Sequence, residues 1–257
     1  MLIPTMTYKE MYNHLANDLK KVQIREDYLR RKAIKEFKAE RKFPAWRWYE
    51  YTIPATNNKY IIFFYAESRF FIEKPIADSF CIMFNDKQRF IIQWTAGGYK
   101  QTEDSPISFI RQIHAYTSHF LERYNERFLK NQSLKANDIA CIYLSRNKLG
   151  GMPTTMNEEI NRHLEKYGDG AKYGYRVRDG FCFSRTAVEG TISEDRDRNK
   201  DKVNAMLVLY TTFMNEADMS NTQVSAINEG HYNTWLRCIQ NIQQEDKDGV
   251  ITIQLEP

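Results

Sequence analysis

The sequence predicts an α+β fold, in which an antiparallel sheet packs with helices. A long basic N-terminal helical segment precedes this part of the chain. Three observations predict it. Apolar residues recur at helical spacing through residues 7–42, strand-forming runs follow between residues 45 and 95, and a second β-rich part begins near residue 172. We therefore expect a helical N-terminal extension over residues 1–43 and an α+β core domain over residues 44–257.

The first predicted element is a helix over residues 7–42. Thr7 and Glu10 have the spacing of a capping box, Pro44 ends the pattern, and any break is expected at residues 23–27, where the apolar stripe lapses. The first 50 residues hold 12 Lys and Arg against 7 Asp and Glu, so the net charge of +4 belongs to this segment. Such a helix can bind RNA or another polyanion, although a solvated helix face has the same composition.

Four runs of strand-forming residues come next, at 45–53, 59–71, 79–84 and 89–95. Asn57-Asn58 and Asn85-Asp86 are turn residues between neighbouring runs, which predicts two hairpins of an antiparallel sheet. Aromatic side chains in these runs offer stacking surfaces to unpaired bases, but in strands they more often fill a core or pair across strands.

The strongest periodic pattern predicts one helix over residues 105–131, with Ser105 as its N-cap. Its polar face carries His119, Arg123 and Arg127 at i, i+4 and i+8, so these side chains follow one another along the axis. Two interpretations stay open. The face is either solvated, with neighbouring glutamates pairing with the arginines, or a site that binds and cleaves a phosphodiester.

The second half of the chain mixes helix and strand patterns. Short helices are expected over 137–146 and 154–167, and strand 172–178 turns at Asp179-Gly180 into a hairpin. The apolar run within 202–213 predicts a central strand covered on both faces. A helix at about 221–243 and a short strand over 250–255 complete the expected order.

Several classes of function lose support because their motifs are missing. The chain has no zincin, P-loop, dinucleotide-binding or α/β-hydrolase motif, so no cofactor is expected. Its four cysteines are far apart, which favours buried reduced thiols over a zinc site or disulfides. The longest apolar run spans only residues 61–66, and no secretory signal opens the chain, so we expect a cytoplasmic protein with no membrane partner.

The order of four short motifs resembles that of an uncharacterised bacterial family. These are H-F-x-x-R-Y-x-E-R-F at residues 119–128, Ser145-Arg146-Asn147, Arg178-Asp179-Gly180, and Thr211-Thr212-Phe213 with Gln223 beyond. More distantly, a helix followed by an antiparallel sheet is similar to the metal-independent ribonucleases of the barnase, EndoU, colicin and RelE type. That resemblance covers about residues 105–225 and implies that histidine, arginine and hydroxyl side chains face the scissile phosphate.

The resemblance assigns roles to five residues. His119 would act as general base or acid, and Arg123 and Arg127 would hold the phosphate and the charge of the transition state. Thr211 or Thr212 would orient the phosphate, although β-branched residues are also ordinary at a strand end. The alternatives are a nucleic-acid- or protein-binding module without catalysis and a metal-dependent hydrolase that uses His119 with distant carboxylates.

Overall fold

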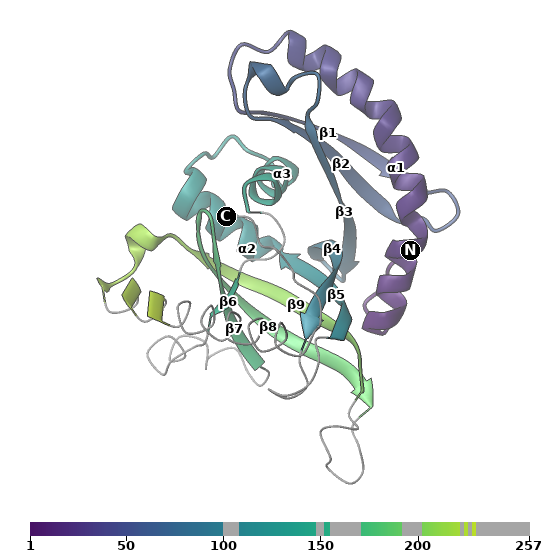
Figure 1. The fold of residues 1–257 in the computed structure, drawn as a ribbon, viewed down its shortest axis with the longest axis vertical. Coiled ribbons are helices and arrows are strands. Elements are labelled where there is room, and N and C mark those ends of the chain that lie inside the picture. The colour runs from purple at the N-terminus through teal and green to yellow at the C-terminus, as the bar shows by residue number, and fades with distance from the viewer. Residues whose placement is uncertain are drawn as a thin grey trace, which may run out of the picture.

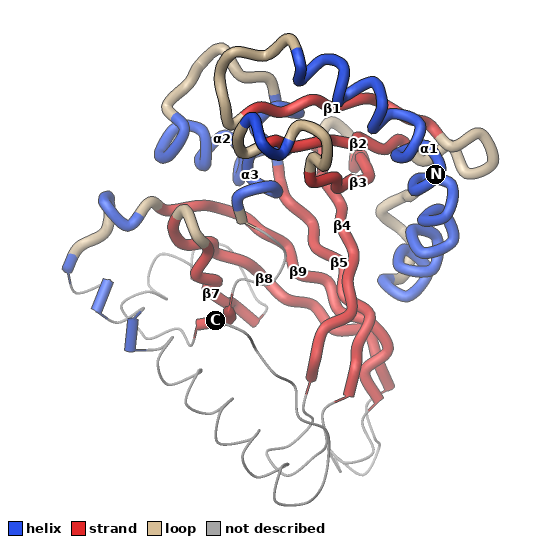
Figure 2. Tube along the Cα trace, turned by 45° about the horizontal axis from the view of Figure 1, so that its top comes forward, coloured by secondary structure: helices blue, strands red, loops and turns tan. Residues whose placement is uncertain are grey.

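The structure, a computed structural model, describes residues 1–99, 108–147, 152–154, 171–191, 202–221, 224–225 and 228–229, and it has an α+β fold in three layers (Figure 1). The described strands form one nine-stranded sheet in the order β1-β2-β3-β4-β5-β9-β8-β7-β6. Helix α1 packs along one face of the curved sheet, while α2 and α3 lie on the other (Figure 2). The fold class is the one that the sequence predicts.

Helix α1, Tyr8–Lys38, begins at the capping box formed by Thr7 and Glu10. It runs without interruption through residues 23–27, because Val22 and Leu29 on either side both remain buried in the core. Its apolar face shares one hydrophobic core with residues of the sheet such as Ile62. The helix is therefore part of the packing of the sheet, and only its outer face is left for other contacts.

The first five strands form an antiparallel meander: β1 Ala45–Thr52, β2 Lys59–Ala66, β3 Ile76–Asn85, β4 Gln88–Tyr99 and β5 Ser108–Thr117. Asn57 and Asp86 adopt the positive φ angles, 53° and 52°, that their turns require. The predicted run 59–71 is shorter as a strand, since β2 ends at Ala66 and the 3-10 turn η1, Arg69–Phe71, follows.

The single helix predicted over residues 105–131 is wrong in its first half. Residues 108–117 form β5, helix α2 covers only Ser118–Tyr124, and a π-helical turn, η2, follows at Asn125–Leu129. Thr117, not Ser105, is the N-cap, because its side chain accepts a hydrogen bond from the Phe120 N–H. Because the strand is covered on both faces, apolar residues occur on both and the alternation of a half-buried strand is lost. The helical spacing of these residues is therefore a coincidence.

The remaining elements complete the sheet and its second cover. Helix α3, Ala136–Arg146, packs on α2, β1 and β2. The strands are β6 Met152–Thr154, β7 Ala171–Val177, β8 Gly180–Thr191 and β9 Lys202–Met214, followed by the turn η5, Glu216–Asp218. Gly180 has φ +152°, and a Cβ at this position would lie 2.4 Å from the Met214 carbonyl oxygen, so the turn requires glycine.

Strand β9 joins the two halves of the sheet. It pairs antiparallel with β8 and parallel with β5, from Arg111 opposite Ala205 to Tyr116 opposite Tyr210. This confirms the predicted central strand. The helix predicted over 221–243 and the strand over 250–255 lie mostly or wholly outside the described residues, as does nearly all of the helix over 154–167.

Candidate functional site

The residues predicted to act on a phosphodiester are divided between α2, η2 and β9. His119 is exposed, and the described residues give it no hydrogen bond or ion pair. Arg123 Nη1 lies 2.7 Å from Glu126 Oε2, and the two side chains are 40% and 57% exposed. At this turn the helix face shows the i,i+3 pairing that the solvated interpretation expects.

Arg127 connects η2 to the end of β9. Its Nη1 donates to the Phe213 carbonyl oxygen at 2.5 Å, and the Asn215 amide donates to the Arg127 carbonyl oxygen at 3.2 Å. Thr211 Oγ1 donates to the Phe183 carbonyl oxygen at 3.2 Å, and Thr212 is paired with Phe183 in the sheet. The structure thus brings Arg127 to the end of β9, but it does not bring His119 or Arg123 into the same contacts.

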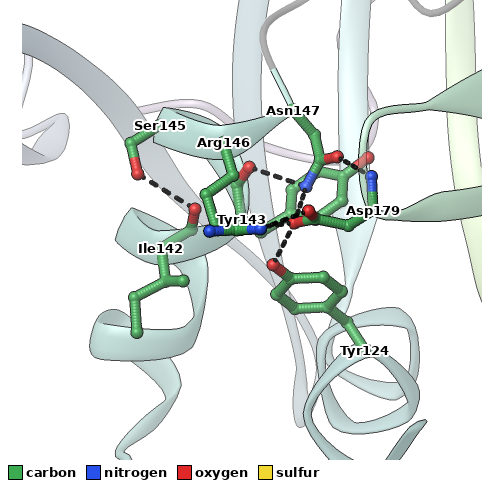
Figure 3. Close-up of polar contacts among 7 residues, drawn as sticks. All are labelled: Tyr124, Ile142, Tyr143, Ser145, Arg146, Asn147 and Asp179. Atoms are coloured by element: carbon green, nitrogen blue, oxygen red, sulfur yellow. Dashed lines mark hydrogen bonds and ion pairs between the residues drawn. The ribbon is translucent and has the colours of Figure 1, made fainter. Parts of the chain in front are cut away.

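A mostly buried polar cluster, which we call the Asp179 cluster, lies where α2, α3 and the β7–β8 turn meet (Figure 3). It consists of Tyr124, Arg146, Asn147 and Asp179. Arg146 grips the carboxylate with two N–H groups, Nε at 2.7 Å from Oδ2 and Nη2 at 2.6 Å from Oδ1. The Tyr124 hydroxyl donates to Oδ2 at 2.7 Å. One carboxylate therefore joins α2, the end of α3 and the β7–β8 turn.

Asn147 completes the Asp179 cluster by acting as donor and acceptor at once. Its amide nitrogen donates to Asp179 Oδ2 at 2.9 Å, and its amide oxygen accepts the Asp179 backbone N–H at 2.9 Å. The Arg146 guanidinium lies 5.2 Å from the centre of the Phe128 ring, an additional cation–π contact from η2. Both carboxylate oxygens are thus satisfied by donors of the protein itself.

The electrostatics of the Asp179 cluster favour a fixed charge. Burial raises the pKa of Asp179, but hydrogen bonds from Arg146, Tyr124 and Asn147 outweigh it and hold the pKa below its usual value. The pKa of Tyr124 is raised by burial and by the carboxylate, so its proton stays on the phenol. A group that neither gains nor loses a proton near neutral pH is suited to holding elements together rather than to acid–base catalysis.

The sequence motifs contain the four residues of this cluster, but no catalytic or binding role is expected of them from the sequence alone. Tyr124 lies in the helix motif, Arg146 and Asn147 in the second motif, and Asp179 in the third. The signal present in the sequence is a polar residue at the end of each of three elements. Nothing in a linear pattern shows that three such ends meet, so the cluster became visible only in the structure.

The outer face of α1 presents a stripe of exposed side chains, which we call the α1 stripe: Lys20, Ile24, Tyr28, Arg31 and Lys35. Steps of four and three residues keep them within a narrow arc of the helix. Ile24 and Tyr28 are 63% and 67% exposed, which is unusual for large apolar side chains on a helix that packs on a core.

The cations of the α1 stripe lack the ion pairs that Arg30 and Lys38 form on the same helix. Arg30 pairs with Glu26 at 2.6 Å, and Lys38 pairs with Glu73 at 2.7 Å. Within the described part of the chain, no carboxylate forms an ion pair with Lys20, Arg31 or Lys35. The stripe therefore combines three exposed cations that form no ion pair among the described residues with an exposed aromatic ring.

Among the described residues, no three His, Cys, Asp or Glu side chains gather in a way that would hold a metal ion, and none of the described helices is long and apolar enough to cross a bilayer. No family model, curated protein or solved structure matches the chain. The function of this chain is therefore inferred from the geometry of α2, the Asp179 cluster and the α1 stripe.

Proposed function

We propose that this chain binds RNA, or another phosphodiester polymer, through the α1 stripe. One observation carries the proposal: α1 buries its apolar face in the core and turns outward three cations that form no ion pair with any described carboxylate. Phosphates of a nucleic-acid backbone would supply negative charge to these cations, and binding would release the counterions condensed on the nucleic acid.

The exposed ring of Tyr28 supports a single-stranded ligand. The Arg25 guanidinium lies 4.9 Å from the ring centre and holds one side of the tyrosine against the helix. An exposed aromatic ring among cations can stack on an unpaired base while the cations contact the backbone. Stacking and charge neutralisation read no sequence, so we expect binding with little sequence preference.

The geometry of α2 favours binding over cleavage. His119 is exposed without a partner among the described residues, and the Arg127 guanidinium is engaged by a backbone carbonyl of β9. General acid–base catalysis requires a proton-transfer group and charge-stabilising groups around one reacting atom. The described residues of α2 and β9 offer these groups at separate places, so RNA cleavage by His119 has less support.

The experiment measures the salt dependence of RNA binding by the full chain. A triple variant, Lys20→Gln, Arg31→Gln and Lys35→Gln, should weaken binding and reduce the slope of log K against log salt by about 2, because each phosphate neutralised on a single strand contributes about 0.7. The control removes three other exposed lysines, Lys74, Lys87 and Lys130, by the same substitution and changes the net charge equally.

The comparison of the two triple variants shows whether RNA binds at the α1 stripe. If both triple variants lower the slope equally, the α1 stripe is an ordinary solvated face and RNA is not held there. The same RNA is also inspected for cleavage, with and without EDTA. Cleavage that His119→Ala abolishes would make this a ribonuclease, and cleavage that EDTA abolishes would make it a metal-dependent hydrolase.

A further inference from the structure

A cleft of about 240 Å³ lies at the first turn of α3, on the face of the sheet opposite α1. We call it the Trp48 cleft. It is lined by two aromatic rings and four charged side chains: Trp48, Phe84, Lys59, Arg89, Lys135 and Glu50. Neither the α1 stripe nor the Asp179 cluster includes any of these residues, so the cleft is a separate feature of the molecule.

We propose that the Trp48 cleft binds a nucleotide, with its base against the rings of Trp48 and Phe84 and its phosphate against the cations at the mouth. The ligand is defined by chemistry: a planar aromatic ring that carries an anionic group. Two sources have that chemistry, a free mononucleotide and a nucleotide at the end of an RNA strand. The proposal does not require the α1 stripe to bind RNA.

The aromatic walls are held in different ways. Trp48 is fixed by a hydrogen bond from its Nε1 to Asp138 Oδ1, 2.7 Å long, so the indole is already positioned before a ligand arrives. Phe84 is 56% exposed at the end of β3, where the core gains little from it. A fixed ring beside an exposed ring is an arrangement that a planar ligand completes by excluding water from both.

The charges of the lining favour an anion. Among the described lining residues, Lys59, Arg89 and Lys135 outnumber the acid Glu50, which lies 2.8 Å from the Lys59 ammonium. A second carboxylate, Asp138, lies beside Trp48 and accepts its indole N–H. Arg89 Nη2 donates to the Asn137 side-chain oxygen, and this contact orients the guanidinium while leaving it further N–H donors. The three cations thus exceed the two nearby carboxylates by one positive charge, and a guanidinium with fixed orientation is well suited to phosphate.

The size of the cleft limits what enters it. Pockets that enclose a whole drug-sized ligand occupy about 300–1,000 Å³, so a volume of about 240 Å³ suits one ring system. Lys135 is exposed and the Lys59 side chain is 42% exposed, so both can reach a phosphate that stays at the mouth. The ring and the phosphate are accordingly expected to contact different parts of the lining.

The test titrates the full chain with each of the four nucleoside 5′-monophosphates by calorimetry and follows tryptophan fluorescence in parallel. Phe84→Ala should weaken binding about tenfold, the loss expected for one base–aromatic stack. Lys135→Gln should weaken it several-fold. The matched control is Phe70→Ala, because Phe70 is 96% exposed and does not line the cleft, and it should leave affinity unchanged.

A fourth variant tests the sign of the electrostatics. Glu50→Gln removes the acid found among the described lining residues and should raise the affinity for a nucleotide several-fold, which a purely apolar cleft would not show. The ring requirement is tested with inorganic phosphate as competitor. Phosphate that displaces the nucleotide at equal concentration would overturn the proposed role of Trp48 and Phe84.

One set of titrations distinguishes a free mononucleotide from the end of an RNA strand as the ligand. It also distinguishes binding at the Trp48 cleft from binding at the α1 stripe. A 5′-phosphorylated trinucleotide that binds no tighter than a mononucleotide points to a free nucleotide, and one that binds much tighter, with the same loss in Phe84→Ala, points to an RNA end. The Lys20, Arg31 and Lys35 triple variant should bind mononucleotides normally. No binding of any mononucleotide at millimolar concentration, or binding that Phe84→Ala and Lys135→Gln leave intact, would overturn the proposal.

Discussion

The Asp179 side chain is only 2% exposed. Its negative charge is stable there because Arg146, Tyr124 and Asn147 all donate hydrogen bonds to the carboxylate. Removing one partner of such a pair is costly, since the other charge then remains without compensation. The cluster joins a helix end to a hairpin turn. Its role is consequently to fix the relative position of α2, α3 and β8.

We predict that Asp179→Asn lowers the free energy of unfolding by about 3 kcal/mol, measured by urea denaturation at pH 7. The value lies at the low end of the range for buried pairs, because a quarter of the Arg146 side chain is exposed. The matched control is Glu126→Gln, which breaks the exposed pair with Arg123 and should cost less than about 0.5 kcal/mol. Equal losses in both variants would show that the cluster is not structurally important.

The contribution of Asp179 should also depend on pH. Its pKa is lowered in the folded chain, so the stabilisation is fully present above the unfolded value of about 3.9 and is lost as pH falls through the folded pKa. The gap in stability between the wild type and Asp179→Asn should therefore narrow only below about pH 4. A gap that closes between pH 5 and 7 would contradict the assignment.

The free energy of unfolding should also depend on pH through His114, in a range above that of Asp179. Burial lowers its pKa to about 4, and its ring lies between the Tyr210 hydroxyl at 3.1 Å and the Gln112 side-chain oxygen at 3.3 Å. The unfolded chain takes up the proton first, so stability should fall between about pH 6.5 and pH 4, by an amount on the order of 3 kcal/mol. His114→Gln cannot titrate there, so its unfolding free energy should fall by about 3 kcal/mol less than that of the wild type across that window.

At the scale of the element, β5 and α2 show where a sequence pattern fails. Ile113 and Ala115 face the core shared with α1, while Tyr116 faces the core beneath α2 and α3. Burial on both faces removes the alternation that identifies a strand, and the helical spacing that remains is not evidence of a helix. Where one outer face stays polar, as in α1, the pattern predicted the element and its first turn correctly.

The start of α2 gives a prediction at this scale. Thr117 Oγ1 accepts the Phe120 N–H at 3.0 Å and donates to the Tyr210 carbonyl oxygen at 3.3 Å, so one hydroxyl caps the helix and connects it to β9. Thr117→Val keeps the shape and should cost about 1–2 kcal/mol in thermal or urea unfolding. Thr117→Ser retains the hydroxyl and should recover most of that loss. Similar losses in the two variants would mean that packing, not the cap, matters.

At the scale of the whole molecule, α1 belongs to the same hydrophobic core as the sheet. Leu15→Ala should therefore cost about 2–5 kcal/mol, because Leu15 is only 1% exposed, whereas Leu19→Ala on the outer face should cost little. Helical circular dichroism and tryptophan fluorescence should report one common transition. Loss of helical signal before the fluorescence change would show instead that α1 unfolds as a separate unit.

The sequence was sufficient for the fold class, the helix at the N-terminus and the central position of β9, because each depends on a local pattern of apolar residues. It was not sufficient for the sites. Trp48, Phe84 and Lys135 come from three separate elements, and their meeting at one cleft depends on how α3 crosses the sheet. Such convergence is a property of the tertiary structure, so no spacing rule contains it.

The parallel pair of β5 and β9 has a consequence for synthesis on the ribosome. Residues 1–117 can form the meander and receive α1 as soon as they emerge, but β9 follows only at residues 202–214. Until then β5 is an edge strand whose N–H and C=O groups and buried residues lack their neighbour. The nascent chain thus passes through an interval in which this edge strand is unpaired and open to aggregation.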